Sequence, residues 1–356
     1  MIAVIADDFT GAAELGGIGL RYGLTVEIST EVNSTTNADL IVIDADTRSG
    51  NETNAIQKIE KITQALTALK PEWIYKKTDS VLRGHVVAEL NAQMKTGGRQ
   101  RALLVPANPD LGRTIQNGIY FFNNKPVHES SFSIDPEFAI TSSDVPKMLK
   151  APVHMLKLSS PLPASGIIVG EASEMKDLDH WAAQCDKDIL PAGAAGFFTA
   201  ILDSRKKKKN DEMRSYQPQL PVLYVSGTTF KKSTEAIKKI KAAGGPVIYL
   251  PANEQINTYE KLIIAIDPDI QGNAVELRNQ TAEIVEKILK QHTTGEVFIE
   301  GGSTARAVFD RLGYHRFYPV QELAPGVVRM KVKENDGIYI TVKPGSYAWP
   351  TGTWIF

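Results

Sequence analysis

The ten residues from Lys76 to His85, Lys-Lys-Thr-Asp-Ser-Val-Leu-Arg-Gly-His, gather the densest set of reactive side chains in this chain. They follow a short strand-like run at 73–75 and lead into a helical pattern that starts near Val86. Polar groups between a strand and a helix lie at the edge of an α/β sheet where ligands bind. The segment therefore predicts a site for a small anion, because functional residues are concentrated on loops. The alternative is a solvated turn that is merely charged.

Asp79, Ser80 and Arg83 form a cluster within this segment. Arg83 lies one helical turn after Ser80 if the helix has begun there. Arginine suits a bidentate grip on a carboxylate, and Asp79 could bind sugar hydroxyls or act as a base. The alternative is a local ion pair between Asp79 and Arg83 that caps the helix.

A second candidate site is the pair Asp7-Asp8, at the end of the strand-like run 2–6 and before a helix expected from 11 to 22. Adjacent side chains on a strand point to opposite sides, so one carboxylate would face a crevice. There it could accept a proton from a hydroxyl or hold Mg²⁺. Helix capping by Asp8 or Thr10 is the simpler alternative, but capping does not require two aspartates.

A third loop, residues 106–114, follows the strand-like run 102–106 and has its shape fixed by two prolines and a glycine. Arg113 and Thr114 lie where an anion could be held. The next stretch, 117–130, is typical of a hairpin. His128 in that hairpin could contact a substrate, although a lone histidine is more often an ordinary surface residue.

The second half of the chain has loops rich in glycine and hydroxyl groups, at 226–229, 301–304 and 343–346. Two of them follow a strand and open a helix, where backbone N–H groups and the positive helix end favour phosphate. Two such loops in one domain suggest a nucleotide, although each alone could be plain turn chemistry. Neither loop matches the P-loop pattern or the dinucleotide fingerprint.

The elements that position these loops alternate between strands and helices, which predicts an α/β fold of mostly parallel sheets flanked by helices. Further strands are expected at 40–44, 73–76, 166–170, 222–225, 247–250, 261–266, 297–300, 327–332 and 337–342. Helices are expected at 52–69, 84–96, 176–184, 230–243, 279–292 and 305–312.

The length of 356 residues favours two domains. We expect an N-terminal domain at 1–204, a linker at 205–220 and a C-terminal domain at 221–356, with a cleft between the domains. The linker contains a run of lysines, which could bind an anionic partner but is more typical of a solvated connection.

The composition excludes several classes of protein. The net charge of −1 gives no support to a nucleic-acid-binding protein, which usually has a basic stripe. A content of 42% hydrophobic and 23% charged residues is typical of a globular protein. Cys185 is the single cysteine, so no internal disulfide and no cysteine-rich metal site can form. No apolar run reaches membrane-spanning length and no secretory signal is recognisable. We expect a cytoplasmic protein without a membrane or nucleic-acid partner.

Taken together, these motifs resemble one family, the four-carbon acid sugar kinases formerly called DUF1537 proteins. Asp7–Ala12 resembles its Asp-Asp-[Leu/Phe]-Thr-Gly-Ala, and 76–84 resembles its Lys-Lys-x-Asp-Ser-Thr-Leu-Arg-Gly. The 106–114 loop is similar to its Pro-Ala-x-Pro-x-x-Gly-Arg-Thr, and 128–130 to its His-Glu-[Thr/Ser]. Ser226–Thr228 and Gly301–Ala305 resemble its two glycine loops. The motifs occur in the family's order and cover almost the whole chain.

The resemblance implies a sugar-acid-binding N-terminal domain, a nucleotide-binding C-terminal domain and ATP-dependent phosphorylation of a terminal hydroxyl on threonate, erythronate or 3-oxo-tetronate. With it, Mg²⁺ would bridge the nucleotide phosphates, and Asp8 or Asp79 would orient the hydroxyl and take its proton. Lys76 or Lys77 would lie near the phosphate oxygens. Substrate-binding residues would be Asp7, Lys77, Ser80, Arg83, Arg113 and His128, with Arg83 and Arg113 on the carboxylate. Nucleotide contacts would be Ser226, Gly227, Gly301, Gly302, Ser303, Thr304, Ala305 and Gly345.

The C-terminal tail departs from the family. Members commonly end with Lys-x-Gly-Gly-Phe-Gly, whereas this chain has Lys343-Pro344-Gly345-Ser346-Tyr347-Ala348. Two alternatives follow: a non-catalytic binding protein derived from a kinase, or a kinase for a sugar acid of different length. A homodimer is a further option that the sequence leaves open.

Overall fold

The computed structural model describes residues 1–134, 138–205, 216–228, 230–251, 256–270 and 273–353. Its strands in the first half are β1 (Ile2–Ala6), β2 (Val26–Ser29), β3 (Leu40–Asp44), β4 (Ile74–Lys77), β5 (Arg101–Val105), β6 (Arg113–Gln116), β7 (Ile119–Phe122), β8 (Lys125–Pro126), β9 (His154–Leu156), β10 (Gly166–Gly170) and β11 (Ile189–Gly193). In the second half they are β12 (Val222–Ser226), β13 (Val247–Leu250), β14 (Lys261–Ile266), β15 (Glu296–Glu300), β16 (Arg316–Ala324), β17 (Val327–Val332) and β18 (Asn335–Lys343).

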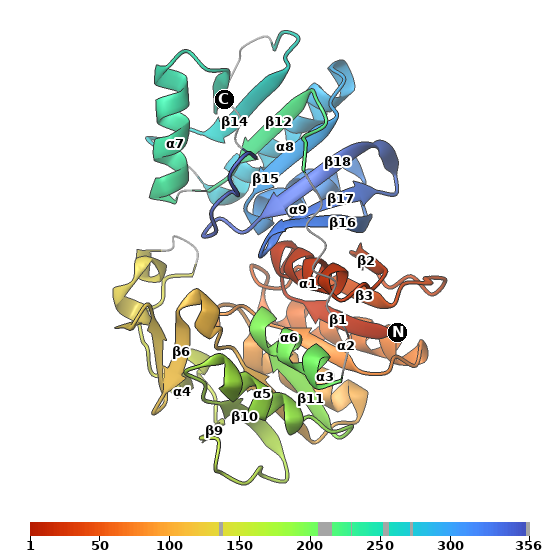
Figure 1. Cartoon of the computed structure of the whole chain (residues 1–356), viewed down its shortest axis with the longest axis vertical. Helices are drawn as coiled ribbons and strands as arrows, with labels where there is room; N and C mark the ends of the chain where they lie inside the picture. The colour runs from red at the N-terminus through yellow and green to blue at the C-terminus, as the bar shows by residue number, and fades with distance from the viewer. Residues whose placement is uncertain (135–137, 206–215, 229, 252–255, 271–272, 354–356) are drawn as a thin grey trace.

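Nine α-helices are found among the described residues. They are α1 (Phe9–Arg21), α2 (Glu52–Ala68), α3 (Val86–Gly97), α4 (Val145–Leu149), α5 (Met175–Ala183), α6 (Ala195–Ser204), α7 (Lys231–Ala242), α8 (Ala274–Gln291) and α9 (Gly302–Leu312). Figure 1 shows the C-terminal half, from green to blue, stacked on the N-terminal half, from red to yellow-green, with α1 between them.

The predicted α/β class is confirmed, and most of the predicted elements form within a few residues of the expected positions. Strands β1, β2, β3 and β11 of the first half are buried along their whole length. Continuous apolar runs suit parallel strands that helices cover on both faces. On one face, Ile5 and Ile43 pack against Ile59 and Leu66 of α2. On the other, Val4 and Val42 pack into the core that contains Leu15 of α1.

A single sheet of 15 strands runs through both halves, in the order β13-β14-β12-β15-β18-β17-β16-β2-β3-β1-β4-β11-β5-β10-β9. The sequence predicts a separate sheet in each half. The two sheets are joined where β16 pairs antiparallel with β2, with Arg316 opposite Ser29 and Phe317 opposite Ile28. A separate three-stranded sheet has the order β6-β7-β8. Its β7 and β8 form a hairpin within the predicted stretch 117–130, and β6 adds a further strand.

Helix α1 fixes the junction between the halves. Its glycines allow close packing: a Cβ on Gly16 would lie 2.8 Å from Ile28 of β2, and one on Gly17 would lie 2.8 Å from Val328 of β17. Phe9, at the start of α1, makes edge-on ring contacts with Phe309 and Phe317 of the C-terminal half, at 4.6 and 4.8 Å between centroids. The two halves therefore share a packed core at this junction, and that core sets the positions of the loops of one half relative to those of the other.

The sequence analysis missed four elements that matter here, β2, β11, α6 and β16. Strand β11 contains Pro191, which is in register with β5, whereas pairing with β4 begins only at Ala192. A proline is tolerated where its missing N–H has no partner to bond. Most of the predicted linker, residues 206–215, lies outside the described residues. Within the described ranges, no helix is both long and apolar enough to cross a membrane.

Candidate functional site

A cavity of about 770 Å³ lies between the two halves, where the carboxyl ends of β1, β12, β15 and β18 meet. The N-terminal half contributes charged, aromatic and hydroxyl side chains to it, namely Asp8, Thr10, Arg48, Arg83, Phe132 and Phe138. The C-terminal half contributes loop residues, which include Gly227, Thr228, Gly301, Gly302, Ser303, Thr304, Pro344, Gly345 and Ser346. Loops predicted separately from the sequence thus form one site.

Arg48 is the centre of the N-terminal wall. Its Nε donates to Asp7 Oδ2 at 2.9 Å, and its Nη1 donates to Asp8 Oδ2 at 2.8 Å. Its Nη2 lies 3.7 Å from Asp79 Oδ1. One guanidinium therefore gathers the three aspartates that the sequence singled out. Because a buried charge is stable only when it is paired, this arrangement offsets the burial of Arg48 with three carboxylates.

Asp8 caps a helix and also lines the cavity. It caps α1, since its Oδ1 accepts a hydrogen bond from the Gly11 backbone N–H at 2.8 Å. Its Oδ2 accepts from the Thr10 hydroxyl at 2.8 Å and also borders the cavity. The capping alternative is therefore realised for Asp8, and it coexists with a position in the site.

Asp79 and Arg83 form the local ion pair that the sequence left open. Arg83 Nη2 donates to Asp79 Oδ1 at 2.7 Å and Arg83 Nε donates to Oδ2 at 2.9 Å. The backbone N–H groups of Val81 and Arg83 also donate to Oδ2, both at 3.1 Å. Asp79 thus holds Arg83 in a fixed orientation, and it is Arg83 that borders the cavity.

Both carboxylates are held in the ionised form. Burial would raise the pKa of Asp8, but Arg48, Lys77 and hydrogen bonds outweigh burial and lower that pKa. For Asp79, burial is outweighed by Arg83 and Arg48, and its pKa falls far below the ordinary range. The pKa of Arg48 is raised, because the three aspartates outweigh its burial. These groups orient and balance charge at neutral pH, and neither carboxylate is a strong base.

The two lysines at the start of the motif differ in environment. Lys76 is fully buried and its Nζ pairs with Glu89 Oε2 of α3 at 2.7 Å, which fixes α3 against β4. Lys77 Nζ donates to Thr78 O at 3.0 Å and lies 3.5 Å from Glu14 Oε2 of α1. A Cβ on Gly11 would lie 3.3 Å from that Nζ. Lys77 is thus the lysine that stands next to the Asp8 loop.

Arg113 lies in an aromatic box that includes a residue of the C-terminal tail. Its guanidinium carbon stands 5.7–5.9 Å from the ring centroids of Phe122, Phe132 and Tyr347. The Arg113 Nη1 donates to the Tyr347 hydroxyl at 3.4 Å, and that hydroxyl donates to Glu14 Oε1 at 2.9 Å. Arg113 Nε is buried without a hydrogen-bond partner among the described residues. The box therefore holds a cation with an unused donor.

Of the six predicted substrate residues, only Arg83 lines the cavity. Asp7, Lys77 and Arg113 lie behind its wall in the contacts described above, and Ser80 and His128 lie in other contacts. The backbone oxygen of Ser80 accepts a hydrogen bond from the Tyr120 hydroxyl at 2.5 Å. His128 makes a 2.7 Å hydrogen bond through Nδ1 with the Ser143 hydroxyl, and its Nε2 lies 3.7 Å from Glu129 Oε1. Their predicted roles in substrate binding stay predictions.

The part of the C-terminal wall that faces the Asp8 loop is formed by glycine and hydroxyl residues at the start of α9. The N-terminus of the 11-residue helix α9 stands directly against the Asp8 loop, since a Cβ on Gly302 would lie 2.9 Å from Asp8 Oδ2 and 3.1 Å from Thr10 Oγ1. Gly301, just before it, has φ 106°, a conformation that favours glycine. A Cβ on Gly227 would collide with the Thr304 hydroxyl. The positive end of a helix and open backbone N–H groups suit phosphate oxygens.

A buried ion pair fixes these loops. Lys343 Nζ donates to Glu300 Oε1 at 2.5 Å and to the Tyr347 backbone oxygen at 2.7 Å. Glu300 and Lys343 stand opposite each other on the parallel strands β15 and β18. Burial lowers the pKa of Lys343 more than Glu300 raises it. The pair therefore joins the 301–304 loop to the tail loop.

Of the predicted nucleotide residues, Gly227, Gly301, Gly302, Ser303, Thr304 and Gly345 border the cavity. Ser226 and Ala305 are buried, and the Ser226 hydroxyl has no partner among the described residues. Apolar residues also line the C-terminal side of the cavity, namely Phe230, Ile266, Pro268, Ile270, Ala274, Val275 and Leu277, beside the polar Lys231, Thr234, Asp267 and Arg278. An apolar region beside phosphate-binding loops suits the base of a nucleotide.

Four residues of this network, Arg48, Glu14, Glu300 and Tyr347, were not predicted as site residues, whereas Lys343 lies in the predicted loop 343–346 without a predicted role. Arg48 follows strand β3 by four residues in Thr47-Arg48-Ser49, where no motif surrounds it. Only its position in the sequence could have indicated it. Arg48 follows β3, which pairs with β1, and the carboxyl ends of parallel strands lie at the same edge of the sheet. Glu14 looked like one polar position in an apolar helix, so its contact with the tail had no sequence signal.

The comparisons with known proteins agree with this division of the site. Residues 2–201 match the family model of a sugar-binding N-terminal domain, and residues 205–347 match that of a nucleotide-binding C-terminal domain. A D-threonate kinase from Salmonella typhimurium is 26% identical over 383 aligned positions, which cover 90% of this chain and 89% of the relative. A 3-oxo-tetronate kinase from Haemophilus influenzae is 24% identical and covers 98% of this chain and 97% of its own.

The fold is also known from solved structures. The crystal structure of a DUF1537 protein from Haemophilus influenzae superposes with a TM-score of 0.70 at 20% identity and covers 97% of both chains. At this identity the match concerns the fold alone.

Proposed function

The chain belongs to the family that joins a sugar-binding N-terminal domain to a nucleotide-binding C-terminal domain, and from this membership we propose that it is an ATP-dependent kinase of a four-carbon sugar acid. The acceptor would be the terminal hydroxyl of an acid of the threonate, erythronate or 3-oxo-tetronate class. The observation that supports it most is the close approach of Gly302 to Asp8, which brings a phosphate-binding helix end to a carboxylate.

The nucleotide would bind along the C-terminal wall. The loops at 227–228, 301–304 and 344–346 would hold the phosphates, and the apolar residues around Phe230 and Ile270 would hold the base. The positive end of α9 would face the γ-phosphate and stabilise the charge on it. Phosphoryl transfer depends mainly on such positioning and charge neutralisation.

ATP would enter as its Mg²⁺ complex. Magnesium in kinases is usually held by nucleotide phosphates, water and one or two carboxylates. Within the described residues, no group of three or more histidines, cysteines, aspartates or glutamates could hold a metal alone. Asp8 and Asp267 are the carboxylates that border the cavity, so the donor set fits a metal brought by the nucleotide.

The sugar acid would bind along the N-terminal wall. Arg83, held by Asp79, and Arg113, with its unused Nε donor, would bind the carboxylate. Asp8, ionised and next to the helix end, would orient the terminal hydroxyl and accept its proton as the bond to phosphorus forms. Asp79 would act as a positioning residue, because Arg83 and backbone N–H groups occupy both of its oxygens.

The decisive experiment is a coupled assay of ADP release over sugar acids of four to six carbons. We expect turnover on a four-carbon acid; turnover only on longer acids would support the alternative substrate class. No turnover on any acid, together with no ATP-linked rise in melting temperature, would support the non-catalytic binder.

Two variants test the roles of the aspartates. Asp8→Asn should lower kcat by about a hundredfold while ATP still raises the melting temperature. Asp79→Asn should raise KM for the sugar acid more than it lowers kcat, because it frees Arg83. If both variants keep near-normal turnover, the mechanism is wrong.

A homodimer stays a prediction for this chain. Sedimentation or light scattering at several protein concentrations would test it.

A further inference from the structure

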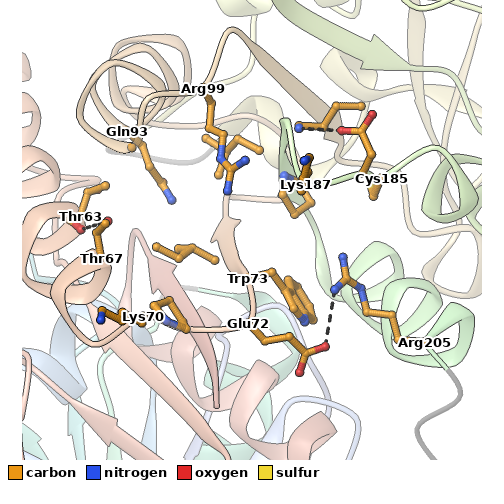
Figure 2. Close-up of a pocket in the computed structure, with 17 residues that line it drawn as sticks. Thr63, Thr67, Lys70, Glu72, Trp73, Gln93, Arg99, Cys185, Lys187 and Arg205 are labelled. Atoms are coloured by element: carbon orange, nitrogen blue, oxygen red, sulfur yellow. Dashed lines mark hydrogen bonds and ion pairs between the residues drawn. The ribbon is translucent and has the colours of Figure 1, made fainter.

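A second cavity, of about 290 Å³, lies at the opposite edge of the sheet, where strands β4 and β11 begin. Helices α2, α3 and α6 end around it. It shares no residue with the interdomain cavity. Figure 2 shows the Gln93 amide and the Arg99 guanidinium directed into this space, with Trp73 and Arg205 on its other side.

The floor of this cavity contains buried polar atoms without partners. Both atoms of the Gln93 amide, the Thr63 hydroxyl and the Trp73 indole N–H have no hydrogen-bond partner among the described residues. The exposed fractions of these side chains are small, at 2% for Gln93, 1% for Thr63 and 7% for Trp73. Buried polar groups are almost always hydrogen-bonded, so such a cluster requires an explanation.

The rim carries more positive than negative charge. Lys70, Arg99, Lys187 and Arg205 face only two acidic residues there, Glu72 and Asp186. Glu72 already pairs with Arg205 at 3.6 Å, and Asp186 pairs with Arg101, outside the cavity lining, at 3.3 Å. Arg99 and Lys187 form no ion pair within the described part of the chain.

The carboxyl ends of three helices partly neutralise the positive charge of this rim. The carboxyl ends of α2, α3 and α6 carry partial negative charge, which cations at this edge partly offset. An anionic group is therefore better placed at the rim, beside Arg99, than on the floor. The Arg205 guanidinium lies 4.8 Å over the Trp73 ring, so it is held in place by stacking and by Glu72.

We propose that this cavity is a second ligand site, for a small hydroxylated oxyanion. Its carboxylate or phosphate would meet Arg99 at the rim, since a guanidinium binds either oxyanion through paired hydrogen bonds. Its hydroxyl groups would reach Gln93, Thr63 and Trp73, which offer both donors and an acceptor. Ile74, Leu190 and Pro191 supply apolar walls for its carbon chain.

Calorimetric titration of the full chain tests the site with three probes: threonate, glycerol 3-phosphate and inorganic phosphate. The first two carry hydroxyls on a carboxylate and on a phosphate ester, so they distinguish the two sources of the charge. At least one should bind more tightly than inorganic phosphate through a site that Arg99→Ala weakens, because threonate is also an expected ligand of the interdomain cavity. Equal binding of all three would overturn the role of the floor residues.

Variants locate the binding. Arg99→Ala and Gln93→Leu should each weaken the bound probe by about tenfold, which is the effect of one lost hydrogen bond to a charged or buried group. Lys95→Ala, a nearby charge whose side chain is 83% exposed, should leave affinity unchanged. Binding at the interdomain cavity would be insensitive to all three variants, and that result would overturn the proposal.

The single cysteine gives a second readout. Cys185 lines this cavity, and burial raises the pKa of its thiol to about 12, so it should react slowly with thiol reagents. Bound probe should slow the reaction further in the wild-type chain, and not in Arg99→Ala. An unchanged rate at saturating probe would mean that the cavity holds water only.

Discussion

The two walls of the interdomain cavity are built on different principles. The N-terminal wall consists of charged side chains that hold one another, with Arg48 between Asp7, Asp8 and Asp79. The part of the C-terminal wall that faces it consists of glycine-rich loops, which are placed by helix α9 and by the Glu300–Lys343 pair. The first wall should therefore be sensitive to charge and the second to volume.

The largest effect is expected for Arg48→Ala. It leaves Asp7 and Asp8 buried without their main cation, which should cost about 3–5 kcal/mol of unfolding free energy. The kcat/KM for the sugar acid should fall about a hundredfold or more, because the wall is no longer organised. Urea denaturation and the ADP-release assay measure the two effects.

Arg101→Ala is the matched control for this prediction. Arg101 pairs with Asp186, whose side chain is 54% exposed, and such pairs contribute at most about 1 kcal/mol. Equal losses in the two variants would mean that the Arg48 network is no more important than a surface pair.

Gly302→Ala tests the sensitivity of the other wall to volume. The new Cβ would lie 2.9 Å from Asp8 Oδ2, so the helix end or the Asp8 loop has to move by a few tenths of an ångström. A shift at the reacting centre should lower kcat/KM for ATP by roughly tenfold to a hundredfold. Steady-state kinetics with varied ATP measures it.

Gly50→Ala serves as the comparison glycine. A Cβ on Gly50 would lie 3.7 Å from Thr47 O, an ordinary van der Waals distance. The kcat/KM of this variant for ATP should therefore match that of the wild type. If Gly302→Ala behaves like Gly50→Ala, the contact between the two walls is irrelevant to catalysis.

Much of each wall could be predicted from the sequence because its residues follow strands directly. Two examples are the paired aspartates after β1, Asp7-Asp8, and the paired glycines after β15, Gly301-Gly302. Asp8 and both glycines border the cavity, and Asp7 pairs with Arg48. Arg48 could not be found in this way, since an isolated arginine in a loop has no pattern. Its partners Asp7 and Asp8 are 41 and 40 residues away and become neighbours only through the order of the parallel strands.

The joining of the two sheets escaped prediction for a related reason. Pairing of β16 with β2 depends on contacts about 290 residues apart, between Arg316 and Ser29. Strand β2 has only four residues, and its apolar pattern alone does not separate it from a loop. Tyr347 likewise reaches Glu14 across 333 positions, a contact that no local pattern records.

The two walls meet at a pair that should respond to pH. Asp44, at the end of β3, accepts a hydrogen bond from Arg306 Nη1 of α9 at 3.0 Å. Burial outweighs Arg306 and raises the pKa of Asp44 from 3.8 to about 7. Between these values the folded chain binds the proton and the unfolded chain does not. The stability from this group is therefore greatest at low pH and is lost as pH rises through 7.

Asp44→Asn should remove this dependence, because an amide mimics the protonated acid. Between pH 4 and pH 7 the wild type should lose about 1–3 kcal/mol relative to the variant. Urea denaturation across that range measures the difference. Asp46→Asn should reduce the slope only in part, because the Asp46 charge raises the pKa of Asp44 less than burial does. A slope unchanged in Asp44→Asn would mean that Asp44 is ionised and simply paired.

The smallest effect should come from Tyr347→Phe, which acts where the C-terminal tail touches the N-terminal wall. The variant keeps the ring over Arg113 but loses the hydroxyl that donates to Glu14 and accepts from Arg113. Unfolding free energy should fall by about 1 kcal/mol. Tyr314→Phe, which loses a 2.9 Å hydrogen bond from Asn335 in the C-terminal half, should cost a similar amount without any change in kinetics.

Kinetics decide what the Tyr347 hydroxyl does. If it competes with the substrate carboxylate for Arg113, its removal should lower KM for the sugar acid about twofold to threefold at constant kcat. A higher KM would instead make the hydroxyl part of the substrate site. The tail would then contribute a charge-sensitive contact to the N-terminal wall, and the division between a charged wall and a backbone wall would hold only for the loops that approach the phosphates.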